Sequence, residues 1–239
     1  MKSWNPRIAL CNEVIAALAW PEQCRLAAAL GYDGLEVAPF TLGELPHRLS
    51  PATRHEVRRV AEDSGVAVTG LHWLLVKPDG LSITSPDPSV RQTTRDVIAG
   101  LVELCADLGG RVLVHGSPAQ RLTHGDREGA LARATEMFAF AGECAGKAGV
   151  DYCIEPLAPG LSELIYTFDE AAAIARRCGV PALTTMIDTS SAALGEREPV
   201  AELVRRALPT GQVGHVHFND RNRKGPGQGA DRFLPVLAA

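Results

Sequence analysis

Three short apolar runs in the second half of the chain each end in an ionisable side chain, and this pattern constrains the fold more than any other feature. The side chains are Glu155, Asp188 and His217, and amphipathic segments of helical type separate them. In parallel β/α barrels the carboxyl ends of the strands meet at one rim, where catalytic side chains gather. The pattern therefore predicts that Glu155, Asp188 and His217 converge at the rim of such a barrel.

The three side chains offer two oxygen donors and one nitrogen donor, a set that suits a divalent metal such as Mn, Mg, Co or Zn. Glu155 is also the predicted catalytic residue, because one carboxylate oxygen can bind a metal while the other accepts a proton. Simpler interpretations stay open. Glu155 could cap a strand against a loop arginine, and Asp188 could form an Asx turn onto Thr189 or Ser190.

Seven apolar segments alternate with amphipathic ones along the 239 residues. We expect strands at 7–11, 34–37, 66–71, 111–114, 150–154, 183–187 and 213–218. We expect helices at 21–31, 51–65, 88–109, 126–149, 167–179 and 199–208. This alternation predicts an α/β fold, a TIM (β/α)8-type barrel formed by residues 1–239 as a single domain. Such a barrel needs eight strands and typically about 250 residues, so we expect the eighth strand to be missing and the domain to be incomplete at its C-terminus.

Charge, hydropathy and cysteine spacing indicate which kinds of partner the protein can have. A net charge of −4 disfavours a nucleic-acid surface, and no apolar run approaches the roughly 18 residues that a membrane span needs. The six cysteines include no C-x-x-C pair, which favours reduced thiols and a cytoplasmic location. We therefore expect a small-molecule substrate, with no nucleic acid and no membrane partner. A homo-oligomer stays open.

Other polar and aromatic residues follow predicted strands and should face the same rim. His72, Trp73 and His115 follow the third and fourth strands, and we expect them to bind substrate. For the two histidines, the alternatives are ligation of an additional metal or a bond to a backbone carbonyl. For Trp73 and Phe40, the alternative is ordinary loop packing. Arg223 is a candidate clamp for a hydroxyl or phosphate group, with a solvated loop arginine as the alternative.

Five short motifs occur in order along the chain: the 31–36 segment Gly-Tyr-Asp-Gly-Leu-Glu, the strand ends at 154–157 and 187–189, the 215–217 segment His-Val-His, and the glycine-rich turn at 222–229. In this order and spacing they resemble the motifs of the sugar phosphate isomerase/epimerase superfamily of xylose isomerase-like barrels. The nearest branch is the ketose 3-epimerases, alongside inosose dehydratases and hydroxypyruvate isomerases.

The resemblance implies a divalent metal held by Glu155, Asp188, His217 and a glutamate on an eighth strand, which has no counterpart in this sequence. The six-residue step from His217 to Arg223 reproduces the family interval, so His217 is the predicted ligand. His215 shares its face of the strand and is assigned, with Glu36, to a supporting role beside the ligands.

The implied activity is that of a metal-dependent isomerase or epimerase, which abstracts a proton beside the metal-bound carbonyl of a small sugar or keto-sugar. Three alternatives stay open. A dehydratase of a keto-polyol could use the same site, an endonuclease IV-like enzyme would hold a zinc cluster, and a sugar-binding protein would catalyse nothing.

Overall fold

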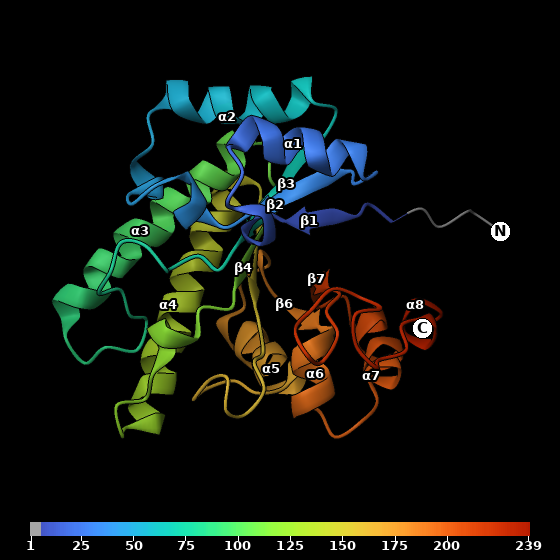
Figure 1. Cartoon of the computed structure of the whole chain (residues 1–239). Helices are drawn as coiled ribbons and strands as arrows, with labels where there is room; N and C mark the ends of the chain where they lie inside the picture. The colour runs from blue at the N-terminus through green and yellow to red at the C-terminus, as the bar shows by residue number, and fades with distance from the viewer. Residues whose placement is uncertain (1–5) are drawn as a thin grey trace.

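The computed structural model describes residues 6–239, and a single parallel sheet lies at its centre (Figure 1). The strands are β1 (Ala9–Cys11), β2 (Gly34–Val37), β3 (Ala67–His72), β4 (Val112–His115), β5 (Asp151–Ile154), β6 (Leu183–Asp188) and β7 (Val213–His217). They are hydrogen-bonded in chain order from β1 to β7, every pair parallel. The predicted (β/α)8-type barrel with seven strands is thus confirmed, and no ladder joins β1 to β7 within residues 6–239.

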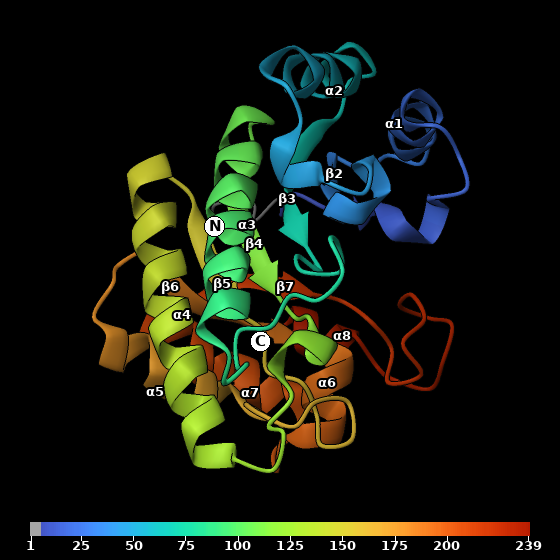
Figure 2. The same cartoon turned by 90° about the vertical axis from the view of Figure 1, so that its left-hand side faces the viewer.

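Helices connect the strands and cover the outside of the sheet (Figures 1 and 2). They are α1 (Trp20–Ala29), α2 (Pro51–Asp63), α3 (Pro88–Asp107), α4 (Arg127–Ala148), α5 (Phe168–Cys178), α6 (Thr189–Gly195), α7 (Val200–Ala207) and α8 (Leu234–Leu237). No helix in this part of the chain has the length and apolar character that crossing a membrane would require.

Local sequence signals explain where α4 and α5 begin. The side chain of Asp126 accepts a hydrogen bond from the Gly129 backbone N–H and caps α4. Thr167 and Glu170 form a capping box at the start of α5, in which each side chain accepts a backbone N–H of the other residue. These contacts satisfy N–H groups that have no partner inside the helix.

The sequence prediction did not anticipate α6, which begins directly after β6. Asp188 is its N-cap, and its Oδ1 accepts the Ser191 backbone N–H at 2.7 Å. The Thr-Ser-Ser sequence at 189–191 has weak helix propensity, so only this cap and the surrounding packing indicate the helix.

Alternation along the strands separates two apolar layers. Val112 and Val114 of β4 face the barrel interior, where they pack with Cys153 and Met186. Leu113, between them, belongs to the larger core that joins the strands to the helices. The interior layer supports the polar cluster at the carboxyl ends of the strands.

Candidate metal centre

Glu155, Asp188 and His217 lie together at the carboxyl ends of β5, β6 and β7. One ligand atom from each lies within 4.8 Å of the other two. Atoms that bind one zinc ion at about 2.0–2.3 Å are separated by roughly 3–4 Å, so small side-chain movements would bring these three donors onto one ion. The chain therefore brings together the donor set that its strand ends predict.

Glu155 is held over the end of β4. A Cβ atom added to Gly116 would lie 1.5 Å from Glu155 Oε2, so the carboxylate occupies the space that a side chain would fill at position 116. Arg121, which is fully buried, donates from Nη1 to the Glu155 backbone oxygen at 2.9 Å. Although the residue is only half-buried, burial of its carboxyl group, together with the charge on Asp188, raises the Glu155 pKa to about 7.

Asp188 is buried, and two donors fix its carboxylate. Its Oδ1 accepts the Ser191 N–H, and its Oδ2 accepts the Asn219 side-chain amide at 2.6 Å. An Asx-type contact of Asp188, the alternative to a ligand role in the sequence analysis, is therefore present. Each oxygen of a carboxylate has two acceptor sites, so these bonds leave room for a cation.

His217 and His215 share one face of β7, and both bond to Glu36 from the opposite side of the barrel. His215 Nε2 lies 2.7 Å from Glu36 Oε2, and His217 Nε2 lies 2.9 Å from Glu36 Oε1. A carboxylate on one ring nitrogen of a histidine orients the other nitrogen toward a metal. Glu36 therefore holds the His217 ring through one oxygen and bonds to His215 through the other.

The charges at this rim favour a cation. Burial alone would lower the pKa of His217, but the carboxylates of Glu36, Glu155 and Asp188 raise it to about 10. Burial acts against the charge on Glu36, yet contacts with His217 and His215 hold its pKa well below the usual range. The carboxylates thus draw a positive charge to His217, and a divalent cation would supply more charge in the same place. Together with the donor geometry, this fits the expected metal.

His72, one of the predicted substrate contacts, lies at the end of β3 and is joined to this network. Its Nε2 is 2.7 Å from Glu13 Oε2, and its ring centroid is 6.1 Å from that of His217. Its Nδ1 is buried and has no hydrogen-bond partner. Cys11 completes a neighbouring group in which one ligand atom each from Cys11, Glu36 and His72 lies within 4.8 Å of the others.

His115 lies outside the cluster, contrary to the expectation that it faces the rim. Its Nδ1 is 2.7 Å from the Tyr152 hydroxyl, and its ring packs edge-on against Phe138 of α4 at 5.2 Å. The ring is fully buried, and burial lowers the pKa of His115 to about 3. Alternation along β4 explains why His115 misses the rim. Val112 and Val114 face the interior, so Leu113 and His115 face the helices.

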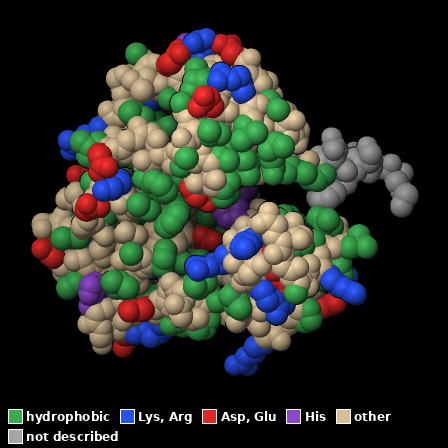
Figure 3. Space-filling view, viewed as in Figure 1, with side chains coloured by type: hydrophobic (Ala, Val, Ile, Leu, Met, Phe, Trp, Pro, Cys, Tyr) green, Lys and Arg blue, Asp and Glu red, His purple; other side chains and the backbone are tan. Residues whose placement is uncertain are grey.

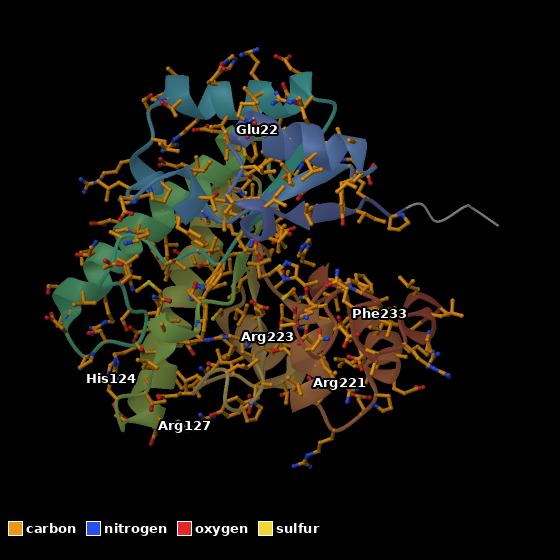
Figure 4. All side chains as sticks on the ribbon, viewed as in Figure 1. Glu22, His124, Arg127, Arg221, Arg223 and Phe233 are labelled. Atoms are coloured by element: carbon orange, nitrogen blue, oxygen red, sulfur yellow. The ribbon has the colours of Figure 1, made fainter. Side chains whose placement is uncertain are left out.

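The other two predicted substrate residues are exposed. Trp73 is 44% exposed, has a positive φ of 51°, and meets Phe40 in an edge-to-face pair at 5.5 Å. Arg223, labelled in Figure 4, belongs to the segment that follows β7 and has a φ of 62°. Its backbone N–H donates to Asp220, while its exposed side chain makes no hydrogen bond within residues 6–239.

In space-filling view, the face shown in Figure 3 is hollowed between the N-terminal strands and the segment around β7, and histidine and carboxylate side chains are visible in the hollow. Several residues of the network were not predicted as site residues, namely Cys11, Glu13, Gly116 and Arg121. Cys11 and Glu13 could have been found, because they close the first strand as Glu155 closes the fifth. The sequence carries no comparable signal for a buried Arg121.

Fold and site together define a parallel β/α barrel whose rim carries clustered oxygen and nitrogen donors. The family model described as xylose isomerase-like TIM barrel matches residues 24–237, and the chain belongs to this family.

Two curated relatives are D-psicose 3-epimerases. The protein from Ruminiclostridium cellulolyticum is 28% identical over 213 residues, which cover 87% of this chain and 69% of the relative. The protein from Agrobacterium fabrum is 27% identical over 207 residues, covering 84% of this chain and 68% of the relative.

Solved structures show the same fold. A D-psicose 3-epimerase crystallised in the presence of D-fructose superposes with a TM-score of 0.83 at 21% identity, over 97% of this chain and 79% of the other. The 3-keto-D-glucoside 4-epimerase from E. coli gives a TM-score of 0.82 at 18% identity, over 98% and 86% of the two chains.

Proposed function

We propose that this protein is a divalent-metal-dependent sugar epimerase or isomerase that removes a proton from the carbon beside a substrate carbonyl. The observation that carries the proposal is the convergence of Glu155, Asp188 and His217 ligand atoms within 4.8 Å. The similarity to two D-psicose 3-epimerases supports a ketose as the substrate class.

Glu155, Asp188 and His217 would hold the metal, with Glu36 fixing the His217 ring from behind. A bound divalent cation acts as a Lewis acid that stabilises negative charge developing on a carbonyl oxygen. Mn, Mg, Co and Zn all accept this donor set.

Glu155 is the proposed base. A group whose pKa lies near the working pH can both take and return a proton. Burial raises the pKa of Glu155 to about 7. The C–H bond of the substrate breaks, its proton passes to the Glu155 carboxylate, and the electron pair stays on the substrate. Return of this proton from Glu155 to the neighbouring carbon gives the isomer. The epimer forms when water on the opposite face donates a proton to the same carbon, and Glu155 then releases its proton to solvent.

Substrate binding is proposed for His72, Trp73 and Arg223. The His72 ring centroid lies 6.1 Å from that of the proposed ligand His217, which supports a place beside a bound substrate. Trp73 and Phe40 offer an aromatic surface for the carbon face of a sugar. The unbonded Arg223 guanidinium could donate to hydroxyl groups. His115 is left out of this set because of its place between β4 and α4.

The proposal extends to the setting of the enzyme. All six cysteines carry free thiols, which supports a cytoplasmic protein. The partner is a small-molecule sugar.

The test is hydrogen exchange in D2O with D-psicose and added Mn2+, followed by NMR at the carbons flanking the carbonyl. Wild type should incorporate deuterium and form an epimer, while Glu155→Gln should lose at least about 100-fold in rate. Glu128→Gln, an exposed change in the first turn of α4, is the matched control and should match wild type. Undiminished exchange in Glu155→Gln, or no exchange by wild type with any ketohexose, would overturn the proposal. Loss of water from the product would instead identify a dehydratase.

A further inference from the structure

A second group of possible ligands lies at the ends of the first three strands. Cys11 and Glu36 are aligned partners in the β1–β2 ladder, and His72 ends β3. One sulfur, one oxygen and one nitrogen from these residues lie within 4.8 Å of one another. None of the three is among the proposed ligands on β5, β6 and β7.

The orientation of His72 indicates a ligand in this group. Glu13 Oε2 lies 2.7 Å from Nε2, so one side of the ring is fixed by a carboxylate. The other nitrogen, Nδ1, is buried without a hydrogen bond, and it lies 3.6 Å from Glu36 Oε1, beyond hydrogen-bond length. The residue is only 6% exposed. An unpaired buried nitrogen is costly, and a carboxylate on the far side of the ring is the usual support of a metal-bound histidine.

A third group, formed by Glu36, His215 and His217, differs in this respect. Both of its histidines already bond to Glu36, at 2.7 and 2.9 Å, and neither has a buried nitrogen without a partner of the kind that His72 has. The Cys11 thiol, in contrast, makes no hydrogen bond within residues 6–239. It also lies in the field of four carboxylates, those of Glu36, Glu13, Glu155 and Asp188. One divalent cation on β5–β7 leaves this negative charge only partly balanced.

We propose that Cys11, Glu36 and His72 form a second cation site that prefers a borderline metal such as zinc. A thiolate, an imidazole and a carboxylate are characteristic zinc ligands, and the thiolate disfavours Mg2+ and Mn2+. On binding, the thiol S–H bond breaks, the proton passes to solvent, and a sulfur–metal bond forms. Glu36 also bonds to His217, so an ion here touches the support of the first site.

Co2+ titration of the full chain tests this site, because a thiolate bound to Co2+ gives a sulfur-to-metal charge-transfer absorption that oxygen and nitrogen ligands do not. Wild type should bind about two equivalents and show this band. Cys11→Ser should lose the band and one equivalent, and His72→Gln should do the same if Cys11→Ser does not fold. Cys178→Ser, a cysteine outside the cluster, is the matched control and should retain both.

Asp188→Asn separates the two sites, because an asparagine can still cap α6. This variant should lose one equivalent and keep the band. Binding of one equivalent without the band, abolished by Asp188→Asn, would overturn the second site and leave the proposed function standing. A band that survives in Cys11→Ser would also overturn it. One equivalent with the band, insensitive to Asp188→Asn, would support the second site and refute the proposed first one.

Discussion

Substituting alanine for Gly116 should disable the site while leaving the fold nearly unchanged. The new Cβ would lie 1.5 Å from Glu155 Oε2, whereas real Cβ contacts begin near 3.0 Å, so the carboxylate must withdraw by about 1.5 Å. A misplacement of about 1 Å in a catalytic group can cost 100-fold in rate. We therefore expect Gly116→Ala to lower kcat/KM by at least about 100-fold, or about 2.7 kcal/mol, and to weaken Mn2+ binding.

The free energy of unfolding should change by less than about 1 kcal/mol, because the clashing atoms end a side chain that can move and alanine reduces unfolded-chain entropy. Gly146→Ala is the matched control. It lies within α4, and its added Cβ meets only Ala182 at 3.5 Å, so this variant should gain about 0.5–1 kcal/mol and keep full activity. Mn2+ affinity by calorimetry, exchange rates and thermal unfolding measure these effects. Wild-type Mn2+ affinity and exchange in Gly116→Ala would refute the placement of Glu155.

Three further outcomes follow from the structure. Mn2+ affinity should rise as pH increases through about 7, where Glu155 loses its proton, and should keep rising toward about 10, because the raised pKa of His217 keeps that ligand protonated up to there. The contribution of Glu155 to the stability of the metal-free protein should fall between its ordinary pKa of 4.5 and 7. Calorimetry across this pH range would contradict both expectations by showing no change. Tyr152→Phe removes the buried bond to His115 and should cost about 1–2 kcal/mol in denaturant unfolding with the exchange rate unchanged; a large loss of rate would return His115 to the site. Thr167→Ala breaks the capping box with Glu170 and should cost about 1 kcal/mol without altering Mn2+ affinity, as urea titration and calorimetry would show.

Strand positions and the donor cluster follow from local sequence, since an apolar run that ends in an ionisable residue indicates both. The side of the sheet to which each strand-end residue points depends on the exact residue at which the strand ends. Glu155 comes one residue after β5 and reaches the interior, whereas His115 is the last residue of β4 and faces α4. Because alternation has a period of two, an error of one residue in the strand boundary reverses the predicted side. The sequence does not determine that boundary closely enough.

Features that depend on tertiary packing could not be predicted from the sequence. The buried Arg121 and the contact of Gly116 with Glu155 join residues more than thirty positions apart, and neither leaves a periodic or motif signal. Glu36 is a further case. From the sequence we expect it in a supporting role beside the ligands. Its two histidine partners on β7 could not be predicted, because they reach Glu36 only when the sheet curves far enough to bring β2 and β7 face to face.

That curvature explains why Glu36 links the two halves of the rim. One of its oxygens bonds to His217, whose neighbours are Glu155 and Asp188, and the same oxygen lies 3.6 Å from the unpaired nitrogen of His72. A cation on either side would compete for the charge of this carboxylate. If both sites fill, Glu36 must be shared, and occupancy of one should change the affinity of the other by the same factor in both directions. The barrel interior therefore places a single carboxylate where it can couple the two proposed sites.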